Sequence, residues 1–118
     1  MKLQRESNLM EVFEYIEKVP TCVILFVDQS ALCTQFTTQG WIQQEGIEIV
    51  DVDAEMVDVL QIGKVPQFRF YVEGTEVHDL IGTTTHEHFK TRKSQLFAPT
   101  KMKLSNIKKP ASLPEAEL

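Results

Sequence analysis

The first pattern of apolar and polar positions is a stripe near the amino end of the chain. Asn8 can cap a helix there, with Glu11 as its reciprocal capping partner, and Pro20 closes it. The apolar residues recur at the i, i+3, i+4 and i+7 spacing of one helix face, at Leu9, Val12, Phe13 and Ile16. The pattern therefore predicts an amphipathic helix between Asn8 and Pro20.

Two apolar runs follow, separated by a weaker helical pattern. Cys22–Val27 is continuously apolar and rich in β-branched residues, which predicts a strand buried on both faces. Residues 47–52 predict a second strand. Residues 30–44 are predicted as one helix, although Gly40 lowers its helix propensity. The apolar positions of that helix are Leu32, Cys33, Phe36, Trp41 and Ile42. A helix of this length suits a right-handed crossover between parallel strands.

The second half of the chain predicts a short helix, a hairpin and a last helix. Asp53 can cap the short helix, which runs through Val57 and Leu60. Residues 67–72 are predicted as a strand because side chains alternate along them. Phe68, Phe70 and Val72 would lie on one face of the strand, and Gln67, Arg69 and Tyr71 on the other. Glu73-Gly74 forms the turn, and residues 77–81 return as the hairpin partner. Thr84 and Glu87 form a capping box for the last helix, whose inward residues are Phe89, Leu96 and Phe97.

This order of elements predicts an α/β domain with a small mixed four-stranded sheet and helices on both faces. A chain of 118 residues is long enough for one domain, which we place at residues 1–97. Residues 1–7 could add a fifth strand at the amino-terminal edge, although the short, charged hexapeptide before Ser7 disfavours it.

Charge separates the domain from the end of the chain. The net charge is −5, yet residues 98–118 hold four lysines and two glutamates, a net charge of +2. Three prolines and no lasting periodicity in that stretch predict a flexible Lys- and Pro-containing tail. The tail is either a solvated segment without a role or a docking segment for a larger partner.

The acidic balance and the hydropathy exclude several classes of function. Phosphate neutralisation needs a basic face, so a net charge of −5 argues against nucleic acid as a partner. No stretch reaches the roughly 20 apolar residues of a membrane span, and the amino end lacks a signal-peptide pattern. We therefore expect an intracellular, reducing compartment. We also expect no cofactor and no metal, because His86 and His88 face apart at i, i+2, and Asp51 and Asp53 lack the glycine of a calcium loop.

The order and the local motifs resemble the thioredoxin family. The most specific match is "IGKVPQFRFYVEGTEVHDLIG", residues 62–82. The family has an apolar residue and a cis-proline there, then a strand, a turn glycine eight residues later and a second strand ending in glycine. Val65-Pro66, Gly74 and Gly82 stand at those places, and "IVDVDAE", residues 49–55, resembles the central strand of the family.

The catalytic motif departs from that pattern. Thioredoxins carry Trp-Cys-Gly-Pro-Cys after the first buried strand, whereas this chain has Ser30-Ala31-Leu32-Cys33 in place of Cys-x-x-Cys. The first cysteine of the family is the attacking thiolate and the second resolves the mixed disulfide, so both are needed for turnover. A serine hydroxyl has neither the acidity nor the redox couple. Ser30 has a structural role available as a helix N-cap.

The two cysteines cannot act as a pair. They stand at opposite ends of the predicted strand and loop, roughly 20 Å apart at about 3.3 Å per residue, whereas a disulfide needs Cα atoms within about 7 Å. Cys22 is expected to be a buried apolar residue. Cys33 is either a buried thiol or a monothiol that forms mixed disulfides or takes up glutathione.

Two functions follow from the resemblance. The first is a redox-inactive thioredoxin-like module, an adaptor or subunit of a larger assembly, that binds a protein partner. Its binding residues are Ser30, Ala31, Leu32, Val65, Pro66, Ile81 and Gly82. The second is a monothiol oxidoreductase or thiol sensor with Cys33 as its catalytic residue and glutathione as a possible partner.

Overall fold

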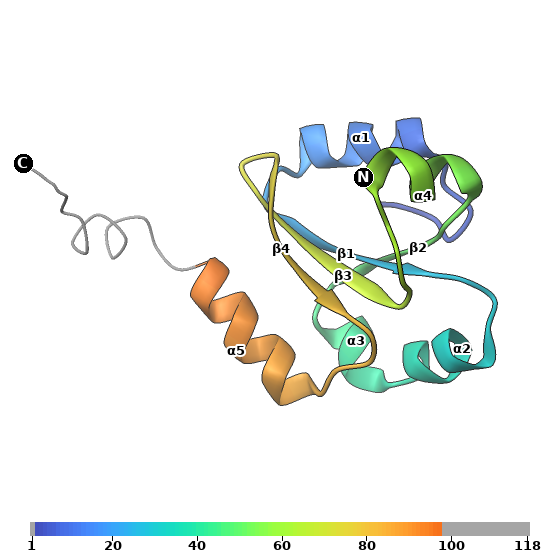
Figure 1. Cartoon of the computed structure of the whole chain (residues 1–118). Coiled ribbons are helices and arrows are strands. Elements are labelled where there is room, and N and C mark those ends of the chain that lie inside the picture. Colours follow the sequence, from blue (N-terminus) through green and yellow to red (C-terminus); the bar gives the residue numbers. More distant parts are fainter. Residues whose placement is uncertain (1, 98–118) are drawn as a thin grey trace, which may run out of the picture.

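The computed structural model describes residues 2–97, which fold around one mixed sheet (Figure 1). Within those residues the sheet has four strands in the order β2-β1-β3-β4. β1 (Cys22–Val27) pairs in parallel with β2 (Glu48–Asp51) and antiparallel with β3 (Gln67–Val72). β3 continues through the turn at Glu73-Gly74 into its antiparallel neighbour β4 (Thr75–Ile81).

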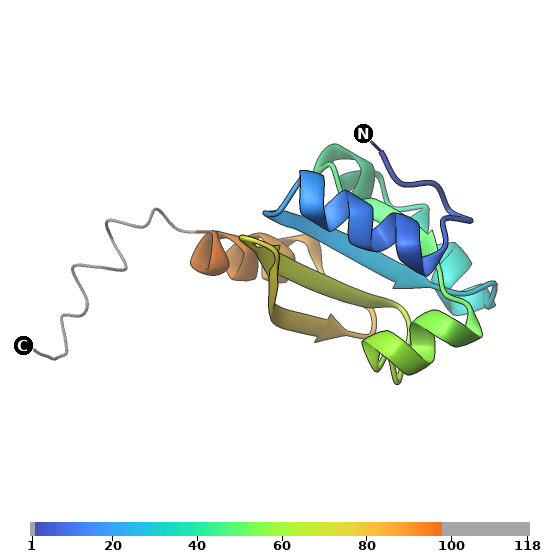
Figure 2. The ribbon, with the colours of Figure 1, turned by 90° about the horizontal axis from the view of Figure 1, so that it is seen from above.

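Helices cover both faces of the sheet (Figure 2). α1 (Leu9–Lys18) and α4 (Ala54–Leu60) lie on one face. α2 (Ala31–Thr37), α3 (Gly40–Gln44) and α5 (His86–Leu96) lie on the other. The expected α/β architecture with a four-stranded mixed sheet is thereby confirmed. The predicted tail, residues 98–118, lies outside the described residues.

The helix starts follow the sequence signals closely. Asn8 Oδ1 accepts the Glu11 N–H at 2.9 Å, and Glu11 Oε1 accepts the Asn8 N–H at 2.8 Å, which is the predicted capping box. Asp53 Oδ1 accepts the Met56 N–H at 2.9 Å and so caps α4. These caps fix where α1 and α4 begin.

The single helix predicted over residues 30–44 is wrong, because the chain breaks it into α2 and α3. Gln39 is extended, with φ −68° and ψ 127°, and no side chain caps α3 there. Just before it, the hydroxyl of Thr37 donates to the Thr34 carbonyl at 3.1 Å, and that of Thr38 donates to the Gln35 carbonyl at 2.6 Å. These hydroxyls compete for the backbone groups that would continue the helix.

Two other local predictions are corrected. α5 is capped by Thr85, whose hydroxyl accepts the His88 N–H at 3.1 Å, so Thr84 and Glu87 form no capping box. In α1 the buried stripe contains Tyr15, whereas Phe13 is 43% exposed. Both differences amount to a shift of the helix start or helix face by one or two residues, which the sequence pattern does not determine.

The sheet separates two apolar clusters. Because every residue of β1 is buried, alternate side chains supply each cluster: Ile24 and Phe26 on the α1 and α4 face, Leu25 and Val27 on the α2, α3 and α5 face. The predicted two-sided burial of β1 is confirmed. No helix within residues 2–97 has the length and apolar character needed to cross a membrane.

The amino-terminal segment runs beside β2 without forming a strand. Leu3 is buried, and its N–H donates to Glu48 Oε1 at 2.9 Å. The Asp51 N–H donates to the Arg5 carbonyl at 2.6 Å, and the Arg5 guanidinium pairs with the Asp51 carboxylate at the same distance. This segment therefore lies against β2 through a few contacts, and no fifth strand forms within the described residues.

Candidate functional site

The loop after β1 is organised around the hydroxyl of Ser30. Ser30 Oγ accepts the Cys33 N–H at 3.3 Å and so caps α2, while Asp28 Oδ1 accepts the Ser30 N–H at 2.9 Å. Hydrogen bonds from Ser30 and from the Cys33 thiol hold the pKa of Asp28 below its usual range. Ser30 thus lies at the first turn of α2 as a capping residue, with its oxygen engaged by the helix backbone.

Both thiols are buried and free. Cys33 has no exposed surface and packs in the cluster beneath α2 and α3 with Phe36 and Phe68. Cys22 belongs to the opposite cluster, where burial and the nearby Glu48 carboxylate raise the pKa of its thiol to about 11. A thiol must reach its substrate as a thiolate. Both thiols lie in the interior, away from the surface where a substrate could reach them.

The Val65–Pro66 peptide bond is cis and is fixed to the end of β4. The Gly82 N–H donates to the Pro66 carbonyl at 2.7 Å, and Gln67 pairs with Ile81 in the ladder. Gly82 has φ +88°, a conformation that other residues rarely adopt. Within residues 2–97, the Val65 N–H and C=O form no hydrogen bond, so an extended peptide could pair with both.

We call the predicted binding residues the cis-proline face: Ser30, Ala31, Leu32, Val65, Pro66, Ile81 and Gly82. Leu32 is 54% exposed and Ile81 is 59% exposed, whereas Val65 is half-buried and Pro66 is buried. Val65 packs against both apolar clusters, including the one that contains Cys33. Ile81 pairs with Gln67, whose side chain bonds Arg69 on the face covered by α1 and α4, whereas Leu32 belongs to α2 on the other face. The arrangement offers apolar side chains and unpaired backbone groups at the surface, above a buried thiol.

Replacing Ser30 with alanine is expected to lower the free energy of unfolding by about 1 kcal/mol, since the Cys33 N–H loses its partner. Chemical denaturation of the wild type and of Ser30→Ala would measure this. Ser30→Gly is the matched control, because glycine is tolerated at an N-cap and should cost only a few tenths of a kcal/mol. Equal losses for both variants would contradict a capping role.

The other candidate ligands serve structural contacts. His86 Nε2 lies 2.8 Å from Glu45 Oε2, and the His86 ring stacks on Trp41 with centroids 4.9 Å apart. Lys93 Nζ contacts the other Glu45 oxygen at 3.1 Å, and these contacts hold the pKa of Glu45 below its usual range. Among residues 2–97, no group of three or more His, Cys, Asp or Glu side chains could hold a metal ion.

The sequence reasoning missed a charged cluster on the face of the sheet covered by α1 and α4. Arg69 is 4% exposed, with its Nε donating to Gln67 Oε1 at 2.9 Å and its Nη2 donating to the Gln61 carbonyl at 3.2 Å. Its guanidinium also lies 3.6 Å from Glu76 Oε1 and 3.5 Å from Asp79 Oδ1. The Nε proton is directed at Gln67 rather than at Asp79. Asp79 Oδ1 is buried and accepts no hydrogen bond from the described residues.

The signal for this cluster lies in the hairpin register. A two-residue turn at Glu73-Gly74 would place Arg69 opposite His78 in a regular ladder. The observed ladder shifts by one residue between Phe70 and Tyr71, so that Arg69 pairs with Asp79 instead. Arg69 and Asp79 carry opposite charges on neighbouring strands. The sequence indicates that they pair only once the position of the bulge is known.

Glu76 carries a perturbed carboxyl group. Its hydrogen bond to Asp79 and its partial burial raise the pKa of Glu76 to about 6, against the opposing effect of Arg69. A raised pKa in the folded state stabilises the fold below the usual glutamate pKa of 4.5, and this contribution is lost as the pH rises through about 6.

The Glu76→Gln variant is therefore expected to gain stability relative to the wild type between pH 4 and pH 7. Urea denaturation at several pH values in that range would measure the difference in unfolding free energy. Glu73→Gln, a neutralised carboxylate on the same hairpin, is the control. A difference for Glu76→Gln that falls or stays constant across this range would contradict the raised pKa of Glu76.

Known proteins share the fold with little sequence identity. No family model and no curated protein sequence matches the chain. Thioredoxin from Plasmodium falciparum superposes with a TM-score of 0.62 at 16% identity, over 80% of this chain and 98% of that one. Thioredoxin from Aeropyrum pernix gives 0.58 at 14% identity, over 72% and 83%. Oxidised thioredoxin O2 from Arabidopsis thaliana gives 0.57 at 13% identity, over 81% and 93%. The chain therefore has the thioredoxin fold.

Proposed function

We propose that the chain is a redox-inactive thioredoxin-like module that binds a protein partner through the cis-proline face, as an adaptor or subunit of a larger assembly. The observation that carries the proposal is the state of the loop after β1. The Ser30 hydroxyl caps α2, and the thiol of Cys33 has no exposed surface. In the resemblance to thioredoxins, Ser30 takes the position of the attacking cysteine.

Disulfide exchange proceeds by attack of a thiolate on a sulfur atom, and a second thiol then releases the mixed disulfide. Ser30 supplies no thiolate, and Cys33 would have to leave the apolar cluster of Phe36 and Phe68 to reach a substrate. These points support a role for the loop that does not depend on sulfur chemistry.

Peptide binding needs backbone groups for pairing and apolar surface for side chains. Val65 offers both its N–H and its C=O, while Leu32 and Ile81 offer exposed apolar side chains. An extended segment of a partner protein with apolar side chains at alternate positions fits this arrangement. The partner class is therefore a protein that presents such a segment.

The competing function is a monothiol oxidoreductase or thiol sensor that uses Cys33, with glutathione as its partner. The observation in its favour is that the Cys33 thiol lies near Asp28 and helps to hold the pKa of that carboxyl below its usual range. The thiol function requires the Cys33 sulfur and not the Leu32 side chain. The binding function requires the apolar Leu32 side chain and not the Cys33 sulfur.

Affinity capture with the full chain and quantitative mass spectrometry tests the proposal. Wild-type protein and Cys33→Ser are expected to capture the same proteins, whereas Leu32→Glu and Ile81→Glu lose them. Met10→Glu, which places the same charge at an exposed apolar residue of α1, should retain them. Loss of capture in Cys33→Ser, or glutathione bound to Cys33 in peptide maps, would instead identify the thiol function.

A further inference from the structure

A groove lies on the face of the sheet covered by α1 and α4, at the hairpin end. Its volume is about 830 Å³, and α1, the carboxyl end of α4 and the β3–β4 hairpin line it. We call it the α1–α4 groove. The cis-proline face lies at the other end of β3, since Pro66 precedes the strand and Glu73-Gly74 follows it. The groove is therefore a second surface, separate from the one used in the proposed function.

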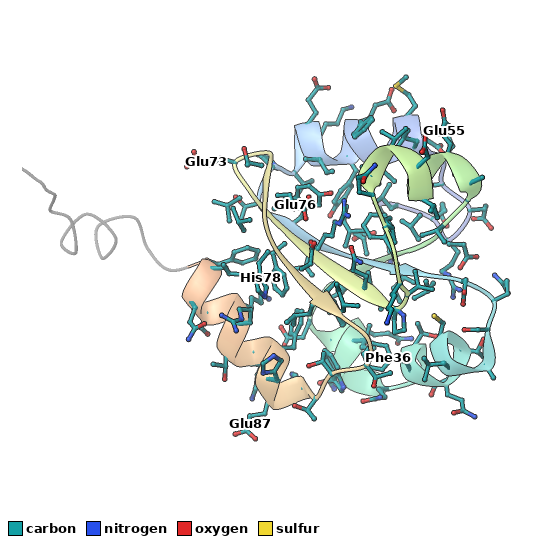
Figure 3. All side chains as sticks on the ribbon, viewed as in Figure 1. Phe36, Glu55, Glu73, Glu76, His78 and Glu87 are labelled. Carbon is teal, nitrogen blue, oxygen red and sulfur yellow. The ribbon has the colours of Figure 1, made fainter. Side chains whose placement is uncertain are left out.

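The lining of the groove combines exposed apolar side chains with an excess of carboxylates. Phe13 is 43% exposed and Val59 is 50% exposed. The carboxylates are Glu17, Glu73, Glu76 and Asp79, against the one buried cation Arg69. Glu73 and Glu76 stand on the hairpin, with Glu76 on the α1 side of the sheet and His78 on the α5 side (Figure 3). A ligand for this surface must be basic and partly apolar.

The chain itself contains a segment of that chemistry. Residues 101–109 read Lys-Met-Lys-Leu-Ser-Asn-Ile-Lys-Lys, with four lysines, three large apolar residues and no acidic residue. Charge complementarity with the groove is direct, since the four carboxylates exceed Arg69 by three charges. We propose that residues 101–109 dock into the α1–α4 groove of the same molecule.

The geometry of α5 makes this docking possible within one chain. The Phe97 ring lies 6.1 Å from the Phe70 ring of β3, so α5 ends beside the hairpin, as Figures 1 and 2 also show. β4 is the last strand of the sheet, and the chain has to pass around that strand alone to reach the groove. Three residues separate Phe97 from Lys101, and an extended chain advances about 3.3–3.6 Å per residue.

The docked segment would complete two features of the groove. Its lysines bring positive charge to the exposed carboxylates of Glu17 and Glu73 in the lining of the groove. Its Met102, Leu104 and Ile107 side chains would cover Phe13 and Val59, which are otherwise exposed. A second copy of the chain or another basic protein could present the same chemistry, and the experiment separates these from the segment.

Paramagnetic relaxation enhancement in the full chain tests the proposal. A nitroxide is attached to Ser105→Cys, and peptide mass spectrometry verifies that the buried Cys22 and Cys33 stay unlabelled. The amide signals of Phe13, Val59 and Tyr71 are expected to broaden strongly, while those of Leu32 and Ile81 do not. A mixture of labelled unenriched protein and unlabelled 15N-enriched protein should show no broadening. Broadening in that mixture, or none at the groove in the labelled chain, would overturn the proposal.

Charge reversal provides the second measurement. Lys101→Glu with Lys103→Glu is expected to abolish the broadening at Phe13 and Val59, and adding Glu17→Lys with Glu73→Lys should restore it. Glu87→Lys, at the end of α5 away from the hairpin (Figure 3), is the matched control and should leave it unchanged. Broadening that survives the reversal of both lysines would contradict docking by charge complementarity.

Discussion

Replacing Phe89 with alanine is expected to lower the free energy of unfolding by about 4 kcal/mol. Phe89 is the fully buried residue of α5, and its ring lies 5.1 Å from Phe68, 5.6 Å from Phe70 and 5.4 Å from Trp41. Removing it leaves a cavity among aromatic rings that the rigid sheet cannot close. Urea or guanidinium denaturation followed by fluorescence of the single tryptophan would measure the loss.

Phe13→Ala is the matched control for this change, because the same ring is removed from a position that is 43% exposed. Its cost should stay below about 1.5 kcal/mol, since part of that surface already contacts water. Phe89→Ala should also weaken the attachment of α5, and we expect faster amide hydrogen exchange in this helix than in α1. Equal costs for the two variants would mean that α5 is not held by its buried ring.

Replacing Arg69 with methionine is expected to destabilise the fold by about 3 kcal/mol at pH 7. Methionine keeps much of the apolar stem of Arg69. It removes the guanidinium, which lies 6.0 Å from the centroid of the Phe26 ring and faces Glu76 and Asp79. The two carboxylates then repel each other without a counter-ion. Because both are about one-third exposed, the loss should stay below the upper range for fully buried pairs.

Two measurements separate this charge effect from a packing defect. Adding Asp79→Asn to Arg69→Met should recover part of the lost stability, and lowering the pH below the pKa of Glu76, about 6, should have the same effect. Arg92→Met, which removes a cation from the surface of α5, should change stability by less than about 0.5 kcal/mol. A loss in Arg69→Met that neither treatment reduces would assign the role of Arg69 to packing.

Much of the fold could be predicted because local signals and long-range structure agree. β1 is a continuous apolar run and is buried on both faces, and the capping residues Asn8 and Asp53 begin their helices as expected. The break between α2 and α3 could not be predicted, since it depends on hydroxyl hydrogen bonds of Thr37 and Thr38 that periodicity does not register. The hairpin bulge is a similar case, because register depends on both strands together.

In the candidate site too, the local features could be predicted from the sequence, whereas the features that depend on packing could not. The sequence placed Ser30 at a helix start and Val65-Pro66 before a strand, and the structure joins the latter to Gly82 through the Pro66 carbonyl. The complete burial of Cys33 could not be predicted from the sequence. It depends on packing with Phe36 of α2 and Phe68 of β3, which come together only in the folded structure. The Arg69 cluster escaped sequence reasoning altogether, because a charged residue in an alternating strand suggests an exposed face. Here α1 and α4 cover that face.

The segment that lies along β2 has a consequence for how molecules of this protein meet. An uncovered outer strand is a template on which a second molecule can add its own strand, the first step of aggregation. The Arg5 carbonyl occupies the Asp51 N–H of that template on β2, and the Glu48 side chain holds Leu3 beside the same strand. On the opposite side of the sheet, the bulge and the acidic side chains of β4 oppose such growth. The protein thereby discourages fibril-like self-association by two different means, one at each border of its sheet.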